Sequence, residues 1–526
     1  MVYSKRSYDH TMVWLLVGAL TIFQVCSAHN DLKVIDNRYT TASLSVDVSK
    51  GRQISPVFFG IFFEEINHAG AGGLWAELVS NRGFEAGGRY VPSAISPWGK
   101  IGDDEAIYVV TELSSCFKNN PVAVRMDVLC DQNTCPPGGV GLYNPGYWGM
   151  NIEEGKSYKV EFHVKSSGSL DGVISFVSDD GTQVLAFQRV KADAEKVKDW
   201  TKMEFTLKAR GSYKKARLQF TTSQKGTIWL DQISAMPIDT YKGHGFRNDL
   251  MEMLLKLKPR FLRFPGGCYV EGNFLTNAFR WKETVGPWED RPGHLGDVWN
   301  YWSDDGLGYL EYLQLAEDLD VEPVWVVNNG IGLKDQVDTS LIAPFVQEML
   351  DSVEFARGSP NSTWGSLRAN DIVEMVSYAP LFVNQNDRTW NPDAIFFNTY
   401  KVFGIASYWV QTFFKESSGA TLLNIHFHNH SKPENTYVSA ISWSDKLDQK
   451  NYITVKIVNY NNVTEKLKIS FDGIDPNSVK LWKKTVLTSE NLQDDNTFDN
   501  PTKVTMKRLV PVADGNGQVN DNNVYV

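Results

Sequence analysis

Apolar residues follow two different spacings along this chain, and the spacing changes several times. Some short runs are apolar at nearly every position, which is typical of strands buried on both faces. These runs are Phe58–Phe63, Phe261–Phe264, Pro323–Asn328 and one within Asp371–Val383. Other segments are apolar at every third or fourth position and predict helices: Phe246–Lys258, Gly308–Leu319, Leu341–Phe355 and Tyr400–Phe414. Alternating strands and helices indicate a parallel α/β sheet, and a closed barrel of that class needs about eight strands, more than are found here.

Two further regions alternate apolar and polar residues, which is typical of antiparallel strands. Between residues 92 and 239 the predicted strands are Lys159–Ser166, Val173–Val177, Trp200–Leu207, Ala216–Thr222 and Thr227–Ile233. After residue 420 they are Tyr437–Trp443, Tyr452–Asn459, Lys466–Phe471 and Val479–Leu487. Short alternating strands separated by turns predict two β-sandwiches. In the first, Trp148, Tyr147 and Tyr143 are candidates either for stacking on sugar rings or for the core.

The stretch from Phe261 to Asp305 carries the strongest functional signal. The apolar run stops at Pro265-Gly266-Gly267, and a long segment rich in Trp and charged residues follows. Long loops of this kind are usually functional or disordered, and the aromatic content argues against disorder. A well-packed structural loop is the alternative to a functional one. The earlier run Pro56–Glu65 ends in two carboxylates, Glu64 and Glu65. In a barrel of parallel strands, polar residues at this end of a strand face the active site, and strand alternation allows only one of the two to do so.

The N-terminal segment Met1–Ala28 predicts a secretory signal, with basic Lys5 and Arg6 before an apolar core that is short for a membrane span. We therefore expect a secreted chain that is not held in a membrane after cleavage; a signal anchor is the alternative. The formal net charge is −10 and no basic tract is present. Nucleic acid is therefore an unexpected partner, because binding it needs clustered Lys and Arg.

The cysteines and sequons fit an oxidising, extracellular compartment. Cys130 and Cys135 are close enough in sequence to form a disulfide, and no second close pair suggests a zinc site. Asn361, Asn429 and Asn462 each open an Asn-x-Ser/Thr sequon for glycosylation. The alternating His426, His428 and His430 could place three imidazoles on one strand face, but a polar loop beside a sequon is the favoured interpretation.

Several catalytic arrangements have no counterpart in the sequence. There is no Gly-x-Ser-x-Gly, no His-Glu-x-x-His and no Walker loop, and the chain holds only 9 His. Carboxylates in aromatic surroundings remain, and these are the groups that glycoside hydrolysis uses.

Long motifs in this chain resemble the plant α-L-arabinofuranosidases of glycoside hydrolase family 51. The motifs include FFGIFFEEINHAGAGGLWAELVSNRGFE, FLRFPGGCYVEGN, RWKETVGPWEDRPGH, FARGSPNSTWGSLR and SYAPLFVNQNDRTWNPDAI. The resemblance runs from about Val34 to Val504 with one break. It implies retaining hydrolysis of terminal arabinofuranosyl residues from cell-wall arabinan and arabinoxylan. No metal or organic cofactor is implied, and nothing is implied about the oligomeric state.

The resemblance also implies an architecture and site residues. The expected fold is α/β plus all-β: an incomplete (β/α)₈ barrel with an inserted β-sandwich carbohydrate-binding-like module and a C-terminal β-sandwich. The expected segments are 1–28 (signal peptide), 29–91 (first barrel strand and N-terminal segment), 92–239 (inserted sandwich), 240–415 (remaining barrel, with an internal segment missing after 369) and 416–526 (C-terminal sandwich). Glu64 resembles the family's substrate-binding glutamate, with Glu65 as the alternative, and Gly266, Gly267 and Cys268 line the sugar site. Cys268 stands where many relatives outside plants have an Asn.

One departure from the family pattern affects the chemistry. Relatives supply the acid/base from a Gly-Asn-Glu strand end and the nucleophile from Ser-Glu-Tyr, but this chain contains neither Asn-Glu nor Ser-Glu-Tyr. Instead, Trp364–Arg368 runs through Ala369-Asn370 directly into Asp371. No catalytic carboxylate pair is therefore expected, although Glu271, Glu289, Asp304, Asp305 and Glu374 are candidates to lie near the site. We predict an inactive chain; the alternatives are a non-catalytic arabinan- or xylan-binding protein and a non-functional product of splicing or of an imperfect gene model.

Overall fold

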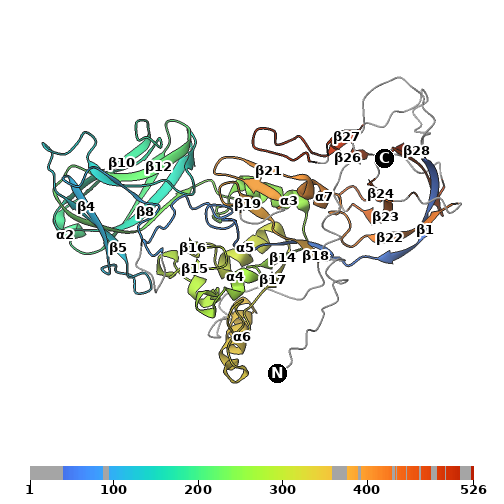
Figure 1. Ribbon diagram of the computed structural model, residues 1–526, viewed down its shortest axis with the longest axis horizontal. Helices are drawn as coiled ribbons and strands as arrows, with labels where there is room; N and C mark the ends of the chain where they lie inside the picture. The colour runs from blue at the N-terminus through green and yellow to red at the C-terminus, as the bar shows by residue number, and fades with distance from the viewer. Residues whose placement is uncertain are drawn as a thin grey trace, which may run out of the picture. The chain divides into compact units, whose positions relative to one another are not determined.

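The computed structural model divides into two compact units, Met1–Phe59 with Phe403–Val526, and Gly60–Val402 (Figure 1). The structure describes residues 40–86, 94–357, 376–388, 393–428, 433, 435–445, 447–460, 464–475, 483–491, 493–509 and 523–525. The predicted signal segment, the three sequons, His430, Glu374 and the junction at residues 369–371 lie outside these residues. No helix in the described part is long and apolar enough to cross a bilayer.

The first unit is built on a sheet that contains the most N-terminal described strand. β1 (Thr40–Gln53) pairs antiparallel with β22 (Thr421–Phe427) and parallel with β25 (Glu465–Asp472). The full order is β24-β23-β22-β1-β25-β28, where the further strands are β23 (Thr436–Ser444), β24 (Asn451–Asn459) and β28 (Asn523–Tyr525). The sequence analysis assigned residues 29–91 to the first barrel strand and an N-terminal segment, and it did not place that segment in a sheet with the C-terminal strands. The alternating, fully buried Ala42, Leu44 and Val46 explain the difference, because they pack in the core of the first unit's sheet.

One predicted helix, near the start of the Phe403–Val526 part of this unit, is shorter than expected. The sequence predicts a helix over Tyr400–Phe414, but Val402–Gly404 forms strand β21 and helix α7 covers only Ala406–Thr412. A Cβ on Gly404 would lie 2.2 Å from the Tyr408 ring, so the close approach of backbone and ring requires glycine at this point. The two short hairpin strands β26 (Lys484–Val486) and β27 (Lys507–Leu509) follow later in the chain.

The second unit contains two antiparallel sheets that enclose one hydrophobic core. The first has the order β10-β9-β12-β6-β3, with β7 paired to β12, and the second has the order β11-β8-β13-β5-β4. Their strands are β3 (Gly99–Ile101), β4 (Ile107–Glu112), β5 (Ala123–Val128), β6 (Val140–Asn144), β7 (Met150–Ile152), β8 (Ser157–Ser166), β9 (Leu170–Val177), β10 (Val184–Ala192), β11 (Thr201–Lys208), β12 (Tyr213–Thr222) and β13 (Gly226–Pro237), with the short helix α2 (Ala194–Val197). Alternation explains the packing, since Val160, Phe162 and Val164 of β8 are all buried in this core.

A four-stranded sheet carries the apolar runs that the sequence predicts as buried strands. Its order is β17-β14-β2-β18, formed by β17 (Glu322–Trp325), β14 (Phe261–Phe264), β2 (Phe59–Phe62) and β18 (Val376–Tyr378). β14 lies parallel to both β2 and β17. Helices α3 (Asn248–Leu257), α5 (Tyr309–Leu319) and α6 (Ala343–Arg357) follow the predicted periodicity, and β19 (Phe382–Asn384) and β20 (Ile395–Phe397) pair in parallel beyond it. The four-stranded arrangement corresponds to half a barrel.

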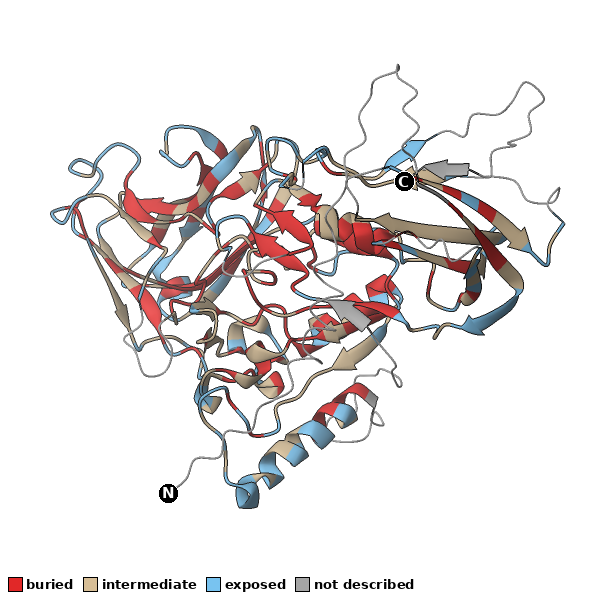
Figure 2. Ribbon diagram, turned by 45° about the vertical axis from the view of Figure 1, so that its right-hand side comes forward, coloured by how far each residue is buried: buried red, intermediate tan, exposed pale blue. Residues whose placement is uncertain are grey.

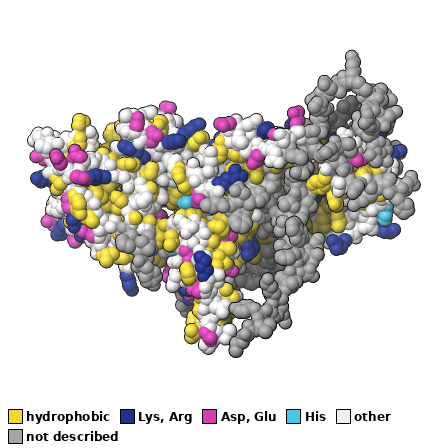
Figure 3. All heavy atoms as spheres, viewed as in Figure 1, with side chains coloured by type: hydrophobic (Ala, Val, Ile, Leu, Met, Phe, Trp, Pro, Cys, Tyr) yellow, Lys and Arg dark blue, Asp and Glu magenta, His cyan; other side chains and the backbone are white. Residues whose placement is uncertain are grey.

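Two features of this region differ from a simple strand–loop–helix pattern. The long loop after β14 is divided into short elements: α4 (Cys268–Glu271), η1 (Leu275–Asn277), η2 (Trp281–Thr284), η3 (Trp288–Asp290), β15 (His294–Gly296) and β16 (Tyr301–Ser303). Helix α6 exposes the apolar side chains of Val346, Leu350 and Val353 on one face. Figure 2 shows much of this helix as exposed, and Figure 3 shows apolar side chains at the surface of the lower end of the molecule.

Candidate functional site

Glu64 is held by the segment that follows the neighbouring strand. β2 and β14 are parallel and adjacent, so the residues after their carboxyl ends meet at one edge of the sheet. There the backbone N–H of Tyr269 donates to Glu64 Oε1 at 2.9 Å. Burial raises the pKa of Glu64, and the N–H groups of Tyr269 and Gly267 partly oppose that rise. The site therefore holds one carboxyl group in a fixed position beside backbone donors.

Gly266 is required for this approach. Its φ of +148° is a conformation that residues with a side chain rarely adopt, and a Cβ there would lie 2.5 Å from Glu64 Cγ. Gly267 contributes its N–H to Glu64. The structure thus brings together Glu64, Gly266 and Gly267, which the sequence analysis grouped at the sugar site.

Cys268 begins helix α4 next to this group and carries a free thiol. Burial raises its pKa, and the nearby charges of Glu64 and Glu271 raise it further. A thiol in this environment stays protonated at neutral pH, so Cys268 offers a weak S–H donor rather than a nucleophilic thiolate.

Glu65 has a different hydrogen-bond partner from Glu64. The strand ends at Phe62, so the alternation used in the sequence analysis does not extend to either glutamate. Glu65 is buried and accepts a hydrogen bond of 3.0 Å from the Tyr301 hydroxyl. Desolvation by burial raises the pKa of Glu65 to about 8. Glu65 therefore acts as a buried hydrogen-bonding group within the loop, and Glu64 is the carboxyl group next to the Gly266–Cys268 segment.

The other candidate carboxylates near this region are bound to protein groups. Glu289 accepts from Lys202 Nζ at 3.2 Å, and Asp304 accepts from the indole N–H of Trp302 at 3.0 Å. Asp305 lies 2.9 Å from His294 Nδ1 and accepts from the Tyr269 hydroxyl at 3.1 Å. Glu271 is a charged neighbour of Glu64.

A buried network of His294, Asp305 and Tyr269 was missed by the sequence analysis. Burial lowers the pKa of His294, but the charge and hydrogen bond of Asp305 raise it by more. Tyr269 then joins this pair to Glu64, because its hydroxyl binds Asp305 while its N–H binds Glu64. No local pattern signals this network, since Tyr269 lies in α4, His294 in β15 and Asp305 just after β16.

The rings of Tyr301 and Trp148 pack against His68, which lies on the loop that follows β2. The His68 ring stacks on Tyr301 with 3.8 Å between ring centroids, and its Nδ1 lies 2.6 Å from Asp387 Oδ2. The Trp148 ring meets the edge of His68 at 5.0 Å. Trp148 is 44% exposed, whereas Tyr147 is only 8% exposed. Of the aromatics proposed for sugar stacking, Tyr147 is therefore a core residue, and Tyr143 is covered by Arg217, whose guanidinium carbon lies 4.3 Å from the ring centroid.

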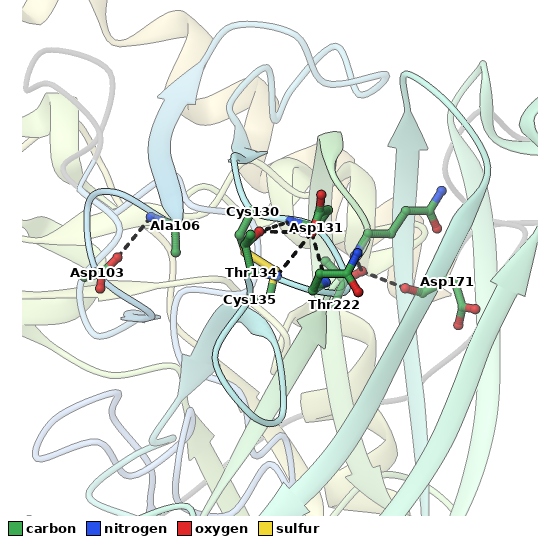
Figure 4. The surroundings of a disulfide bond; sticks show 10 residues. Asp103, Ala106, Cys130, Asp131, Thr134, Cys135, Asp171 and Thr222 are labelled. Atoms are coloured by element: carbon green, nitrogen blue, oxygen red, sulfur yellow. Dashed lines mark hydrogen bonds between the residues drawn. A yellow bond between two sulfur atoms is a disulfide. The ribbon is translucent and has the colours of Figure 1, made fainter.

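Cys130 and Cys135 form a disulfide, as the sequence analysis expected (Figure 4). Between them, Asp131 Oδ1 accepts from the backbone N–H of Asn133 at 2.9 Å and from the Thr134 hydroxyl at 3.0 Å. His426 and His428 are exposed on and just after β22, and no group of metal-binding side chains occurs among the described residues.

Comparison with known proteins identifies the class. A family model described as the α-L-arabinofuranosidase 1 domain matches residues 253–373, and the α-L-arabinofuranosidase C-terminal domain matches residues 361–520. Alpha-L-arabinofuranosidase 1 of Arabidopsis thaliana is 46% identical, covering 93% of this chain and 92% of the relative. Alpha-L-arabinofuranosidase 2 of the same plant is 47% identical, covering 93% and 90%. The chain belongs to the plant α-L-arabinofuranosidases of glycoside hydrolase family 51.

The solved structures and the lengths of these alignments add two points. The arabinose-bound MgGH51 α-L-arabinofuranosidase has the same fold, with a TM-score of 0.77 at 20% identity over 89% of this chain and 96% of that one. The alignment with the first Arabidopsis relative extends over 626 positions, which is 100 more than the 526 residues of this chain. At least that many positions of the alignment therefore have no residue from this chain.

Proposed function

We propose that this chain binds arabinofuranosyl residues at Glu64 but does not hydrolyse the glycosidic bond. The observation that carries the proposal is the fixed position of Glu64, whose Oε1 accepts from the Tyr269 N–H at 2.9 Å. Retaining hydrolysis needs two carboxyl groups about 5–5.5 Å apart, one as nucleophile and one as acid/base. In this proposal Glu64 binds a sugar hydroxyl and is not a member of that pair.

The expected catalytic pair is missing for a reason that lies in the sequence. By family resemblance the acid/base and the nucleophile belong to Asn-Glu and Ser-Glu-Tyr segments, and the chain contains neither. The 100 positions by which the alignment exceeds the chain support an internal deletion, and the two family-model matches meet at residues 361–373, around the junction. In this proposal the four-stranded sheet is an incomplete (β/α)₈ barrel, and residues 92–239 are an inserted carbohydrate-binding-like module.

The substrate class and location follow from the same proposal. The polysaccharide is arabinan or arabinoxylan of the cell wall, and a member with the full catalytic pair would act with retention. The Cys130–Cys135 disulfide supports secretion, because disulfides persist in oxidising compartments. N-glycosylation at Asn361, Asn429 and Asn462 belongs to this proposal as well.

Arabinose release and arabinose binding, measured on the same preparation, test the proposal. The purified full chain, with its mass confirmed, is incubated with a chromogenic arabinofuranoside beside alpha-L-arabinofuranosidase 1 of Arabidopsis thaliana as the comparison. Binding of L-arabinose is followed by ligand-observed NMR for the wild type and Glu64→Gln. We expect binding without turnover, and weaker binding in the variant. Turnover by the chain would refute the claim that it lacks a catalytic carboxyl pair. Equal binding by the wild type and Glu64→Gln would refute the role of Glu64.

Failure to bind any sugar would instead favour the alternative hypothesis that the chain is a non-functional fragment. The exposed apolar face of α6 is the observation that supports this second candidate, because such faces promote aggregation. Size-exclusion chromatography and limited proteolysis of the same preparation distinguish a folded monomer from an aggregating fragment.

A further inference from the structure

We propose that Trp148 is a stacking platform for a sugar ring next to the one bound at Glu64. The inference deepens the proposed function, on which it rests, by assigning a second subsite on the turn between β6 and β7. Its ligand is a neutral oligosaccharide of more than one residue. A free monosaccharide at Glu64 does not need this contact.

The exposure of Trp148 is the first observation. It is the only exposed tryptophan in the part of the chain that the structure describes, and its ring lies outside the sandwich core. The ring is nevertheless held, because it meets His68 edge-on at an interplanar angle of 82°. A fixed aromatic ring with an open face is the surface against which the C–H face of a sugar packs.

The backbone of the turn is the second observation. Trp148 has φ +65°, between Gly146 and Gly149, which also have positive φ. A left-handed conformation is unfavourable for a bulky residue, and glycine would avoid that cost. The turn is closed by the Gly149 N–H, which donates to the Pro145 carbonyl at 2.8 Å. A strained and exposed tryptophan therefore contributes little to the turn itself, and strain of this kind concentrates at ligand-binding positions.

The turn is also anchored to the rest of the unit. The side-chain amide of Asn144 donates to the Ser80 carbonyl at 2.8 Å, and its oxygen accepts from the Gly146 N–H at 2.8 Å. Gly72 lies so close to the turn that a Cβ there would be 2.3 Å from the Tyr147 ring. The platform is therefore rigid before any ligand arrives, which limits the entropy lost on binding.

The residue that contacts Trp148, His68, lies on the same loop as Glu64. His68 follows Glu64 by four positions, and both Asn67 and His68 have positive φ, at 54° and 52°. Tyr301 stacks on His68 and donates to Glu65, and Asp387 lies 2.6 Å from His68 Nδ1. These contacts fix His68, and through it Trp148, relative to the Glu64 loop. The Glu64 loop and the turn that carries Trp148 are therefore joined through His68, and together they can contact two adjoining sugar residues.

The test compares a trisaccharide with a monosaccharide. Binding of α-1,5-linked arabinotriose and of L-arabinose to the full chain is measured by calorimetry and ligand-observed NMR for the wild type and Trp148→Asn. Asparagine tolerates positive φ, so this variant keeps the turn while removing the ring. Trp148→Phe retains an aromatic face, and Tyr108→Ala removes an exposed ring from β4 as a matched control.

We expect Trp148→Asn to weaken trisaccharide binding about tenfold, leave L-arabinose binding unchanged and be partly rescued by Phe. Unchanged trisaccharide affinity in Trp148→Asn would overturn the platform while leaving the role of Glu64 intact. If Trp148→Asn weakens trisaccharide binding but Glu64→Gln does not affect either sugar, the platform stands and the proposed function fails. A wild type that binds neither sugar overturns both.

Discussion

The backbone N–H of Tyr269 donates to Glu64 Oε1 at 2.9 Å, which joins the segments that follow two neighbouring parallel strands. The position of Glu64 therefore depends on the Gly266–Tyr269 segment as well as on β2. Replacing residues in either segment is expected to affect the same site.

Gly266→Ala should weaken sugar binding by displacing Glu64. The new Cβ would lie 2.5 Å from Glu64 Cγ, whereas a Cβ on Gly286 would meet no atom within 4 Å. Both glycines have positive φ, so each alanine variant is expected to lose about 1–3 kcal/mol of stability. We expect at least about a tenfold loss of L-arabinose affinity in Gly266→Ala only. Equal affinities of the two variants in calorimetry would contradict the role of Gly266.

Glu85→Gln should make stability less dependent on pH. Burial raises the pKa of Glu85 to about 7, so the folded protein holds a proton there that the unfolded chain releases above its own, lower pKa. This contribution is present below the unfolded pKa of 4.5 and is lost as pH rises through about 7. Gln still accepts from the Val122 N–H, which donates to Glu85 Oε1 at 2.8 Å.

Urea unfolding from pH 5 to pH 8 measures the difference. The wild type should lose up to about 3 kcal/mol more stability over this range than Glu85→Gln. Parallel curves for the two proteins would show that Glu85 is already ionised in the folded state at pH 5.

Tyr301→Phe should destabilise the second unit. The hydroxyl donates to Glu65 at 3.0 Å and accepts from the His68 N–H at 3.2 Å, so its removal leaves two polar groups without that partner. We expect a loss of about 1–3 kcal/mol in the free energy of unfolding. Tyr108→Phe, at an exposed position on β4, is the control and should change stability by less than about 0.5 kcal/mol.

Removing the disulfide should have a modest effect. Cys130 and Cys135 are five positions apart, and closing so short a loop is worth about 2 kcal/mol in the chain-entropy model. The hydrogen bonds from Asn133 and Thr134 to Asp131 can hold the same turn after Cys130→Ser/Cys135→Ser. We expect a loss of about 2 kcal/mol or less in denaturant unfolding, and none in Cys116→Ser, which removes an exposed free thiol.

Leu350→Lys should reduce dye binding to the α6 face. Leu350 lies between the exposed Val346 and Val353 on one side of the helix. A charge at its centre should lower the fluorescence of bound anilinonaphthalene sulfonate without measurable loss of stability. Leu447→Lys alters an exposed leucine outside this face and should leave the fluorescence unchanged.

The parts of the fold that follow from local patterns were predicted from the sequence. The runs Phe261–Phe264 and Phe58–Phe63 became β14 and β2 because strands buried on both faces leave a continuous apolar signature. β1 was not assigned to its sheet, since its partners Thr421–Phe427 and Glu465–Asp472 are remote in sequence. The helix predicted from Tyr400 was wrong at its start, because the contact of Gly404 with Tyr408 is invisible to periodicity.

The site could be predicted only where a motif marked it. Glu64 and Gly266 were found through long family motifs, but the bonds from Tyr301 to Glu65 and from His294 to Asp305 join residues that share no sequence period. Tyr147 and Trp148 are adjacent aromatic residues, but Tyr147 is buried and Trp148 is exposed. This difference depends on the backbone turn at Trp148, which residue type alone does not predict.

The place of β1 in the sheet also determines when this strand can pair during synthesis, because its partners are made much later. Its nearest partner strand in the chain, β22, begins about 370 residues after β1 ends. At about 5–20 residues per second, the ribosome needs roughly 20–70 s to make that stretch. During this time Ala42, Leu44 and Val46 have no partner strands to cover them. The nascent chain must therefore keep β1 from pairing elsewhere until β22 and β25 have been made.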